Sequence, residues 1–155
     1  MFVRVHTLHI LDAEYVERKK MKNEDKDCWP DFYPPELLLP PDDATDAEGT
    51  VYRLVRSIPP AETCFLATHQ EQPSRHEACH TLEKKQAVYG TSVWATKEQL
   101  LEVVESLPQG MKQRKMACGT VSAAMGKMRK TVEAGHLTLW LRKNSNIHLN
   151  FSEVK

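Results

Sequence analysis

Two residue types that bind metals or act as nucleophiles gather in one short part of the chain. Thiol and imidazole side chains occur there at Cys64, His69, His76, Cys79 and His80. These are the donors that zinc prefers, and His76 and Cys79 have the spacing of one helical turn. No C-x2–4-C pair accompanies them, however, and Cys64 lies in an apolar stretch where burial alone explains a thiol. We therefore expect no resident metal.

A cysteine activated by a histidine needs only to meet its partner in space. Among the four cysteines, Cys118 is the best candidate nucleophile because it stands beside Gly119 in a small-residue segment. The paired acids Asp42 and Asp43 lie among prolines, where solvation explains them better than acid–base catalysis. Because the cysteines show no C-x-x-C spacing, we expect reduced thiols.

The C-terminal half of the chain is locally basic. Its cations are Lys112, Arg114, Lys115, Lys127, Arg129 and Lys130. With His136 or Trp140 nearby, such a patch could bind phosphate, a nucleotide or nucleic acid. No aromatic residue is interleaved among these cations, and the 21 basic and 21 acidic residues of the whole chain cancel. A solvated sheet edge is the alternative, and we expect no nucleic-acid partner.

Three short segments combine aromatic, hydroxyl and basic residues in a fixed order. They are Tyr52-Arg-Leu-Val-Arg56, Tyr89-Gly-Thr-Ser-Val-Trp94 and Gly135-His-Leu-Thr-Leu-Trp140. A Y-R-L-V strand followed by a Y-G-x-S strand that runs into a helix resembles ADP-ribosyltransferase-like and RES-type domains, which act on NAD. The order is also similar to that of small uncharacterised bacterial or prophage proteins that end in a His-containing aromatic strand. The resemblance covers roughly residues 50–140.

This resemblance implies a split antiparallel sheet whose cleft holds NAD. Arg53 or Arg56 would match the basic residue that contacts the dinucleotide, and Tyr89 and Ser92 the pair that shapes the nicotinamide pocket. The family's third-motif acid, which polarises the ribose, has no counterpart, since the late strand offers His136 and Glu133 lies just before it. The candidate catalytic residues are therefore Tyr89, Ser92 and His136, and the candidate NAD-binding residues are Arg53 and Arg56.

The same segments also have a purely structural interpretation. Tyr52, Trp94 and Trp140 would then be core or rim aromatics, and Arg53 and Arg56 would occupy the solvated side of a strand. The sequence leaves both interpretations open, so whether the protein is an enzyme, a degenerate enzyme or neither is undecided at this point.

The pattern of apolar residues predicts the elements that must position these side chains. Strands are expected at residues 2–10, 50–56, 92–95, 115–121 and 127–132, with a terminal β-hairpin formed by 136–142 and 147–151. Short helices are expected at 12–20, 61–68 and 79–88. The clearest helix follows Thr96, which with Gln99 fits a capping box. Because the helices do not alternate regularly with the strands, we predict a single α+β domain with a mainly antiparallel sheet and few helices.

Residues 21–49 form a proline-rich surface excursion that is too apolar for a solvated linker. Its apolar side chains are Trp29, Phe32, Tyr33, Leu37, Leu38 and Leu39. They either bind a protein partner, which would make the protein a non-enzymatic interaction or regulatory protein, or pack on the core as a decorated loop.

No stretch approaches the roughly 18 apolar residues of a membrane helix, and the first residues lack the plan of a signal peptide. We expect a soluble, cytoplasmic protein without a membrane partner.

Overall fold

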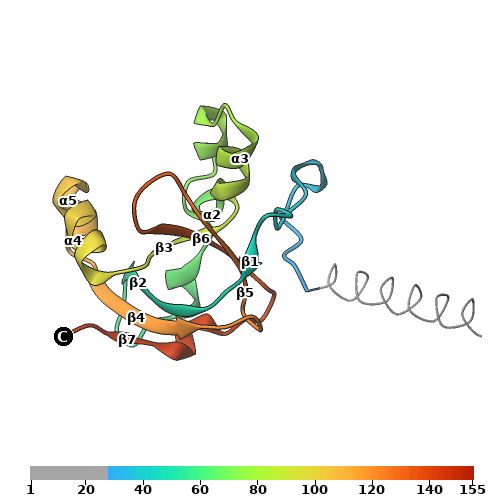
Figure 1. Ribbon diagram of the computed structural model, residues 1–155. Helices are drawn as coiled ribbons and strands as arrows, with labels where there is room; N and C mark the ends of the chain where they lie inside the picture. The colour runs from blue at the N-terminus through green and yellow to red at the C-terminus, as the bar shows by residue number, and fades with distance from the viewer. Residues whose placement is uncertain (1–27) are drawn as a thin grey trace, which may run out of the picture. The chain divides into compact units, whose positions relative to one another are not determined.

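The computed structural model describes residues 28–155. The chain divides between Asp31 and Phe32, and its second unit, Phe32–Lys155, is compact. Every helix and strand named below belongs to the second unit (Figure 1). The strand predicted at 2–10 and the helix predicted at 12–20 lie outside the described residues.

The second unit has the predicted α+β fold, built on one antiparallel sheet of seven strands. The strands are β1 (Thr45–Asp46), β2 (Gly49–Val55), β3 (Thr91–Trp94), β4 (Lys115–Val121), β5 (Gly126–Lys130), β6 (His136–Leu141) and β7 (Phe151–Glu153). Their spatial order is β1-β5-β6-β3-β2-β4-β7. β2 is apolar in both phases because it is a central strand, with β3 on one side and β4 on the other.

The sheet curls and closes on itself through β1 and β2, which are two parts of one bent segment of chain. β1 and β2 are separated only by Ala47 and Glu48, and β4 and β5 only by residues 122–125. β1 pairs with β5 while β2 pairs with β4, so the two long segments run side by side (Figure 1). β3 pairs with β2 and β6, and β6 pairs with β5, which completes the circuit. The sheet therefore has an inner face that is enclosed and an outer face.

The inner face carries the hydrophobic core. Successive strand residues point to opposite faces, and the inner phase of β2 holds Val51 and Val55, which are fully buried. Val93 of β3 and Leu139 of β6 join the same cluster of core residues. Phe151 of β7 completes it from the far end of the sheet.

Short helical segments connect and cover the strands. They are η1 (Pro35–Leu37), η2 (Glu62–Phe65), α2 (Thr68–Glu71), η3 (Arg75–Ala78), α3 (Leu82–Val88), α4 (Lys97–Ser106), α5 (Gln109–Lys112) and η4 (Ile147–Asn150). The predicted cap of α4 is confirmed, because the Thr96 hydroxyl accepts a hydrogen bond from the Gln99 N–H at 3.2 Å. The Thr96 hydroxyl in turn donates to Gln99 Oε1 at 2.8 Å, so this side chain bonds the hydroxyl and not the Thr96 N–H that a complete capping box would engage. Residues 61–68 form the turn η2 and only the first residue of α2, so the continuous helix expected there was wrong.

The predicted C-terminal β-hairpin is also wrong. β6 cannot pair with the end of the chain because β3 and β5 occupy both of its edges. Residues 147–150 instead form η4, which places Ile147 in the core and leaves Leu149 exposed. The chain then pairs β7 with β4, and the Phe151 ring packs at 4.8 Å from Phe65.

The described part of the proline-rich excursion is attached to the domain. Its last residues form β1, which pairs with β5, and Pro41 and Ala44 are buried. Phe32, Tyr33, Leu37 and Leu39 are half-buried, while Leu38 is exposed. These four apolar side chains are thus packed as the decorated-loop alternative predicts, whereas Leu38 remains on the surface.

Candidate functional site

Arg53 is buried on the inner face of β2, between the core residues Val51 and Val55. Its Nε donates to the Cys64 carbonyl at 2.8 Å and its Nη1 to the Ser92 carbonyl at 2.6 Å. Its Nη2 forms an ion pair with Glu71 at 3.0 Å. Burial lowers the pKa of Arg53, and the Glu71 carboxylate opposes that change. All three nitrogens of the guanidinium are therefore engaged inside the protein.

The other predicted NAD-binding residue lies elsewhere. Arg56 follows the last residue of β2 and is exposed. Arg53, by contrast, joins η2 and α2 to the sheet, because its acceptors come from Cys64 and Glu71. The two arginines consequently face different surroundings, and only Arg56 has a side chain that solvent reaches.

Tyr89 is buried just before β3. Its ring lies at 4.7 Å from the His69 ring, and His69 in turn stacks at 6.4 Å against Phe32. This aromatic group joins the beginning of β3 to α2 and to the proline-rich segment. Among the described residues, the Tyr89 ring thus contacts His69 and not His136, whose ring contacts Trp94 instead.

Ser92 and His136 share the outer face of the sheet. Ser92 pairs with Thr138, and His136 is two residues before Thr138 on the same strand. Two residues in this diagonal relation on neighbouring strands have Cα atoms about 7 to 8 Å apart. Arg53 points to the opposite face, although its guanidinium reaches the Ser92 carbonyl. The structure therefore brings Ser92 and His136 together without Tyr89 or a free arginine.

His136 is the most chemically distinctive group on the outer face. Its Nδ1 lies 2.7 Å from the Thr131 hydroxyl, and its ring meets Trp94 edge-on at 4.9 Å. Burial lowers the pKa of His136, while the carboxylate of Glu133 partly opposes this. A neutral imidazole in this setting can exchange a hydrogen bond with Thr131 and present its other nitrogen to a ligand.

Tyr52, Trp94 and His136 form one row across three adjacent strands. Cys118 extends the row, since it pairs with Tyr52. Three strand spacings separate Cys118 from His136, which corresponds to about 14 Å. A Cys118–His136 nucleophile pair is therefore excluded by the register.

The Cys64 to His80 stretch does not gather its donors at one point. His69 and His76 have ring centroids 5.9 Å apart, while Cys64 lies on the inner side near the Ser57 hydroxyl. Burial raises the pKa of Cys64, but hydrogen bonds from Ser57 and from backbone groups outweigh it and leave this pKa lowered. Within residues 28–155, no three His, Cys, Asp or Glu side chains are placed to hold a metal ion.

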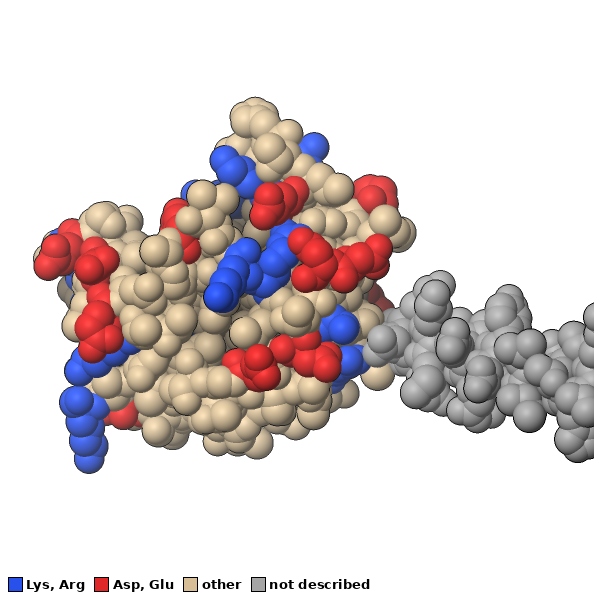
Figure 2. All heavy atoms as spheres, in the orientation of Figure 1, with Lys and Arg blue, Asp and Glu red and all other residues tan. Residues whose placement is uncertain are grey.

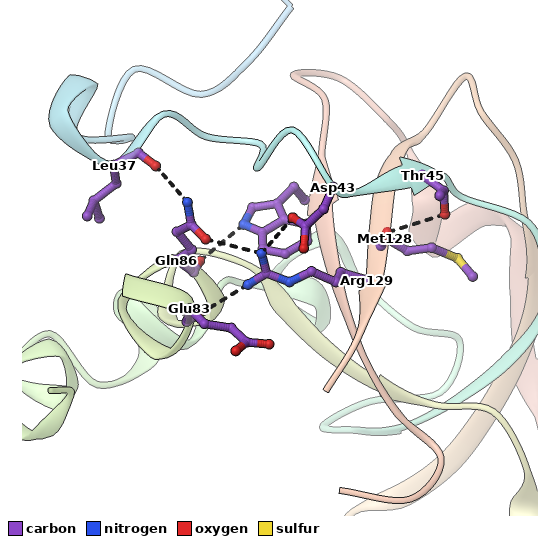
Figure 3. A network of polar contacts seen from close by, with 8 residues as sticks. Leu37, Asp43, Thr45, Glu83, Gln86, Met128 and Arg129 are labelled. Carbon is purple, nitrogen blue, oxygen red and sulfur yellow. Dashed lines mark hydrogen bonds and ion pairs between the residues drawn. The ribbon is translucent and has the colours of Figure 1, made fainter. Parts of the chain in front are cut away.

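Sequence reasoning missed a polar network on the outer face (Figure 3). The Gln86 side chain of α3 donates to the Leu37 carbonyl at 3.0 Å and accepts from Arg129 Nη1 at 3.1 Å. Arg129 also binds Asp43 at 3.0 Å and the Glu83 carbonyl at 3.2 Å. No periodicity could reveal this network, because its members come from three distant segments.

Trp140 lies beneath this network and is fully buried. Its indole N–H donates to the Gln86 carbonyl at 3.1 Å, and the Arg129 guanidinium lies 5.1 Å above its ring. The network therefore fastens α3 and η1 to the sheet as one unit. Part of the predicted basic patch is used internally, since Lys127 also pairs with Asp46. On the face shown in Figure 2, lysines and arginines alternate with acids and form no continuous basic surface.

Two exposed leucines lie on segments that contact each other, Leu38 just after η1 and Leu82 as the first residue of α3. Leu38 follows Leu37, whose carbonyl is bonded to Gln86, and Leu82 is one helical turn before Gln86. Leu38 is 72 % exposed and Leu82 is 59 % exposed. The polar network below them fixes the backbone on which both are carried.

Comparison with known protein families, curated proteins and solved structures finds no match for the chain. The resemblance to NAD-acting domains therefore stays a prediction. Among residues 28–155, no helix has the length and hydropathy required to cross a membrane.

Proposed function

We propose that the protein is a non-enzymatic interaction domain that binds a protein partner through the surface around Leu38 and Leu82. The observation that carries this proposal is the exposure of both leucines at one junction. Gln86 and Arg129 hold that junction together through four hydrogen bonds to Leu37, Asp43, Glu83 and each other. When exposed apolar groups are carried on a fixed backbone, little ordering is needed on binding, which favours affinity for a partner.

Point substitutions test this proposal better than removal of the proline-rich segment. A deletion would take away β1 and Asp43, and with them part of the fold. Leu38 has φ +52°, a conformation that asparagine adopts readily, so Leu38→Asn changes the surface and keeps the backbone. Leu82→Gln is the corresponding change in α3.

The measurement is crosslinking in native extract followed by identification of the captured proteins. A partner should be captured by the wild-type protein and lost with the Leu38→Asn/Leu82→Gln double variant. Leu149→Asn is the matched control, since Leu149 is 73 % exposed in η4. Identical capture by the wild type and the double variant would contradict the proposal.

A second candidate function is binding of NAD or a related nucleotide on the outer face. The specific observation in its favour is that Ser92 and His136 share this face with the half-buried aromatics Tyr52 and Trp94. Such rings can stack on a base, and the imidazole and hydroxyl can bind a ribose. The engaged guanidinium of Arg53 weakens this candidate, since it leaves Arg56 as the accessible predicted arginine.

Thermal denaturation with increasing NAD distinguishes the two functions. A ligand that binds only the native state raises Tm in a saturable way. The nucleotide candidate predicts a rise that is lost with His136→Gln and retained with Leu38→Asn. Absence of any shift at millimolar NAD would exclude it.

A further inference from the structure

We infer that the Leu38/Leu82 surface recognises a protein segment in which lysine or arginine side chains flank apolar ones. This inference rests on the proposed function and specifies the chemistry of the partner.

The segment that carries Leu38 is strongly acidic. Between Phe32 and Tyr52 the sequence contains no lysine or arginine, and its carboxylates are Glu36, Asp42, Asp43, Asp46 and Glu48. The whole chain is electrically neutral, so this is a local excess. A negative field around an apolar contact favours a positively charged partner and raises the rate of encounter with it.

Only part of this negative charge is neutralised within the domain. Asp43 pairs with Arg129 and Asp46 pairs with Lys127. Glu36 and Asp42 are exposed, and neither forms an ion pair with any described residue. Glu36 lies in η1 itself, two residues before Leu38. The free carboxylates therefore flank the exposed leucine.

The charges on α3 orient the partner. Lys84 and Lys85 are exposed close to Leu82, whereas Glu36 and Asp42 lie on the η1 side. The basic groups of a partner should consequently lie over η1 and its apolar groups over the two leucines. The unpaired acids beside Leu38 would repel an anionic membrane or a nucleic acid from the η1 side, which favours a protein segment with basic groups at that side.

Binding of two fluorescently labelled helical peptides to the full chain tests the inference by anisotropy. Both peptides carry leucines at i, i+3, i+4 and i+7, with lysines on the flanks of one and glutamates on the flanks of the other. The lysine peptide should bind at least about tenfold more tightly, and added salt should weaken it. Equal binding, tighter binding of the glutamate peptide, or binding of neither would overturn the inference.

Variants separate specific recognition from general charge attraction. Leu38→Asn should reduce binding of the lysine peptide about tenfold, and Glu36→Gln/Asp42→Asn should reduce both its affinity and its salt dependence. Leu149→Asn should leave binding unchanged. Lysine-peptide binding that is insensitive to Leu38→Asn would overturn the inference, as would preferential binding to anionic vesicles.

The crosslinking experiment keeps this inference distinct from the proposed function. If a partner is captured through Leu38 and Leu82 but its crosslinked segment is acidic or uncharged, the inference fails and the interaction function stands. If no capture depends on these leucines, the interaction function itself fails.

Discussion

Two arginines, one on each face of the sheet, fasten distant segments to it in the same way but in different surroundings. Arg53 binds three acceptors on the inner face, and Arg129 binds three on the outer face. Both arginine side chains are about nine-tenths buried. The difference lies in their carboxylate partners, since the Glu71 side chain is 16 % exposed and the Asp43 side chain is 71 % exposed.

This difference determines what each ion pair can do. If Arg53 is lost, Glu71 and two carbonyls stay shielded from water without a partner. If Arg129 is lost, water can solvate Asp43. The inner pair is therefore committed to stability, while the outer pair lies beside an accessible surface that can take part in binding.

The largest effect is expected from Arg53→Met. It should reduce the free energy of unfolding by about 3 to 5 kcal/mol, because it leaves a largely buried carboxylate unpaired. Urea denaturation of this variant and of Arg56→Met, the exposed arginine at the end of the same strand, provides the comparison. Equal stability of the two variants would show that the guanidinium of Arg53 is not an internal anchor. Adding Glu71→Gln should restore part of the loss.

Arg129→Met should have a smaller effect, about 2 kcal/mol. It removes hydrogen bonds to Gln86 and Glu83 and a cation–π contact with Trp140, while Asp43 regains water. Urea denaturation measures the change under the same conditions. A loss as large as that of Arg53→Met would remove the proposed distinction between the faces.

Thr138→Val should raise the free energy of unfolding by about 1 kcal/mol. The Thr138 hydroxyl is buried on the outer face and has no hydrogen-bond partner within residues 28–155. Valine keeps the branched shape and removes the unsatisfied group, whose burial is unfavourable. The Tm from calorimetry reports the change. Destabilisation by this substitution would indicate that the hydroxyl has a partner, such as a bound water or ligand.

The smallest effect concerns pH. The pKa of His136 in the folded protein lies below the ordinary value of 6.5, so the unfolded chain binds more protons near that pH. The free energy of unfolding should fall as pH drops through about 6.5, and His136→Gln should make this dependence shallower. Urea titrations between pH 8 and about 5 measure it. An unchanged slope in the variant would assign the dependence to other groups.

Local patterns predicted those parts of the fold that local chemistry determines. The helix after Thr96 begins where the Thr96 hydroxyl accepts a hydrogen bond from the Gln99 N–H, only three residues away. The strand at 115–121 was predicted from the side chains of that segment alone. The terminal hairpin failed for a non-local reason. Its two segments alternate correctly, but β3 and β5 already occupy the edges of β6, and no pattern within 136–151 contains that information.

The candidate site was harder to predict because the residue types alone do not show to which face of the sheet each side chain points. Arg53 and Ser92 were both expected in one cleft, yet their side chains point to opposite faces of the sheet. One sign was present, since Arg53 stands between two valines in a strand that is apolar in both phases. Gln86 gave no sign at all, because its partners Leu37 and Arg129 are more than 40 residues away along the chain.

The closed sheet also sets a schedule for synthesis. β2 finds its main partner, β4, only after about 70 more residues have been made, as the pairing of Gly49 with Val121 shows. At about 5 to 20 residues per second, an apolar strand emerges from the ribosome and waits on the order of 4 to 14 s for that partner. During this interval an edge of β2 has no partner strand, which exposes it to aggregation or to capture by chaperones. A lower growth temperature and a supply of chaperones should accordingly raise the yield of folded protein.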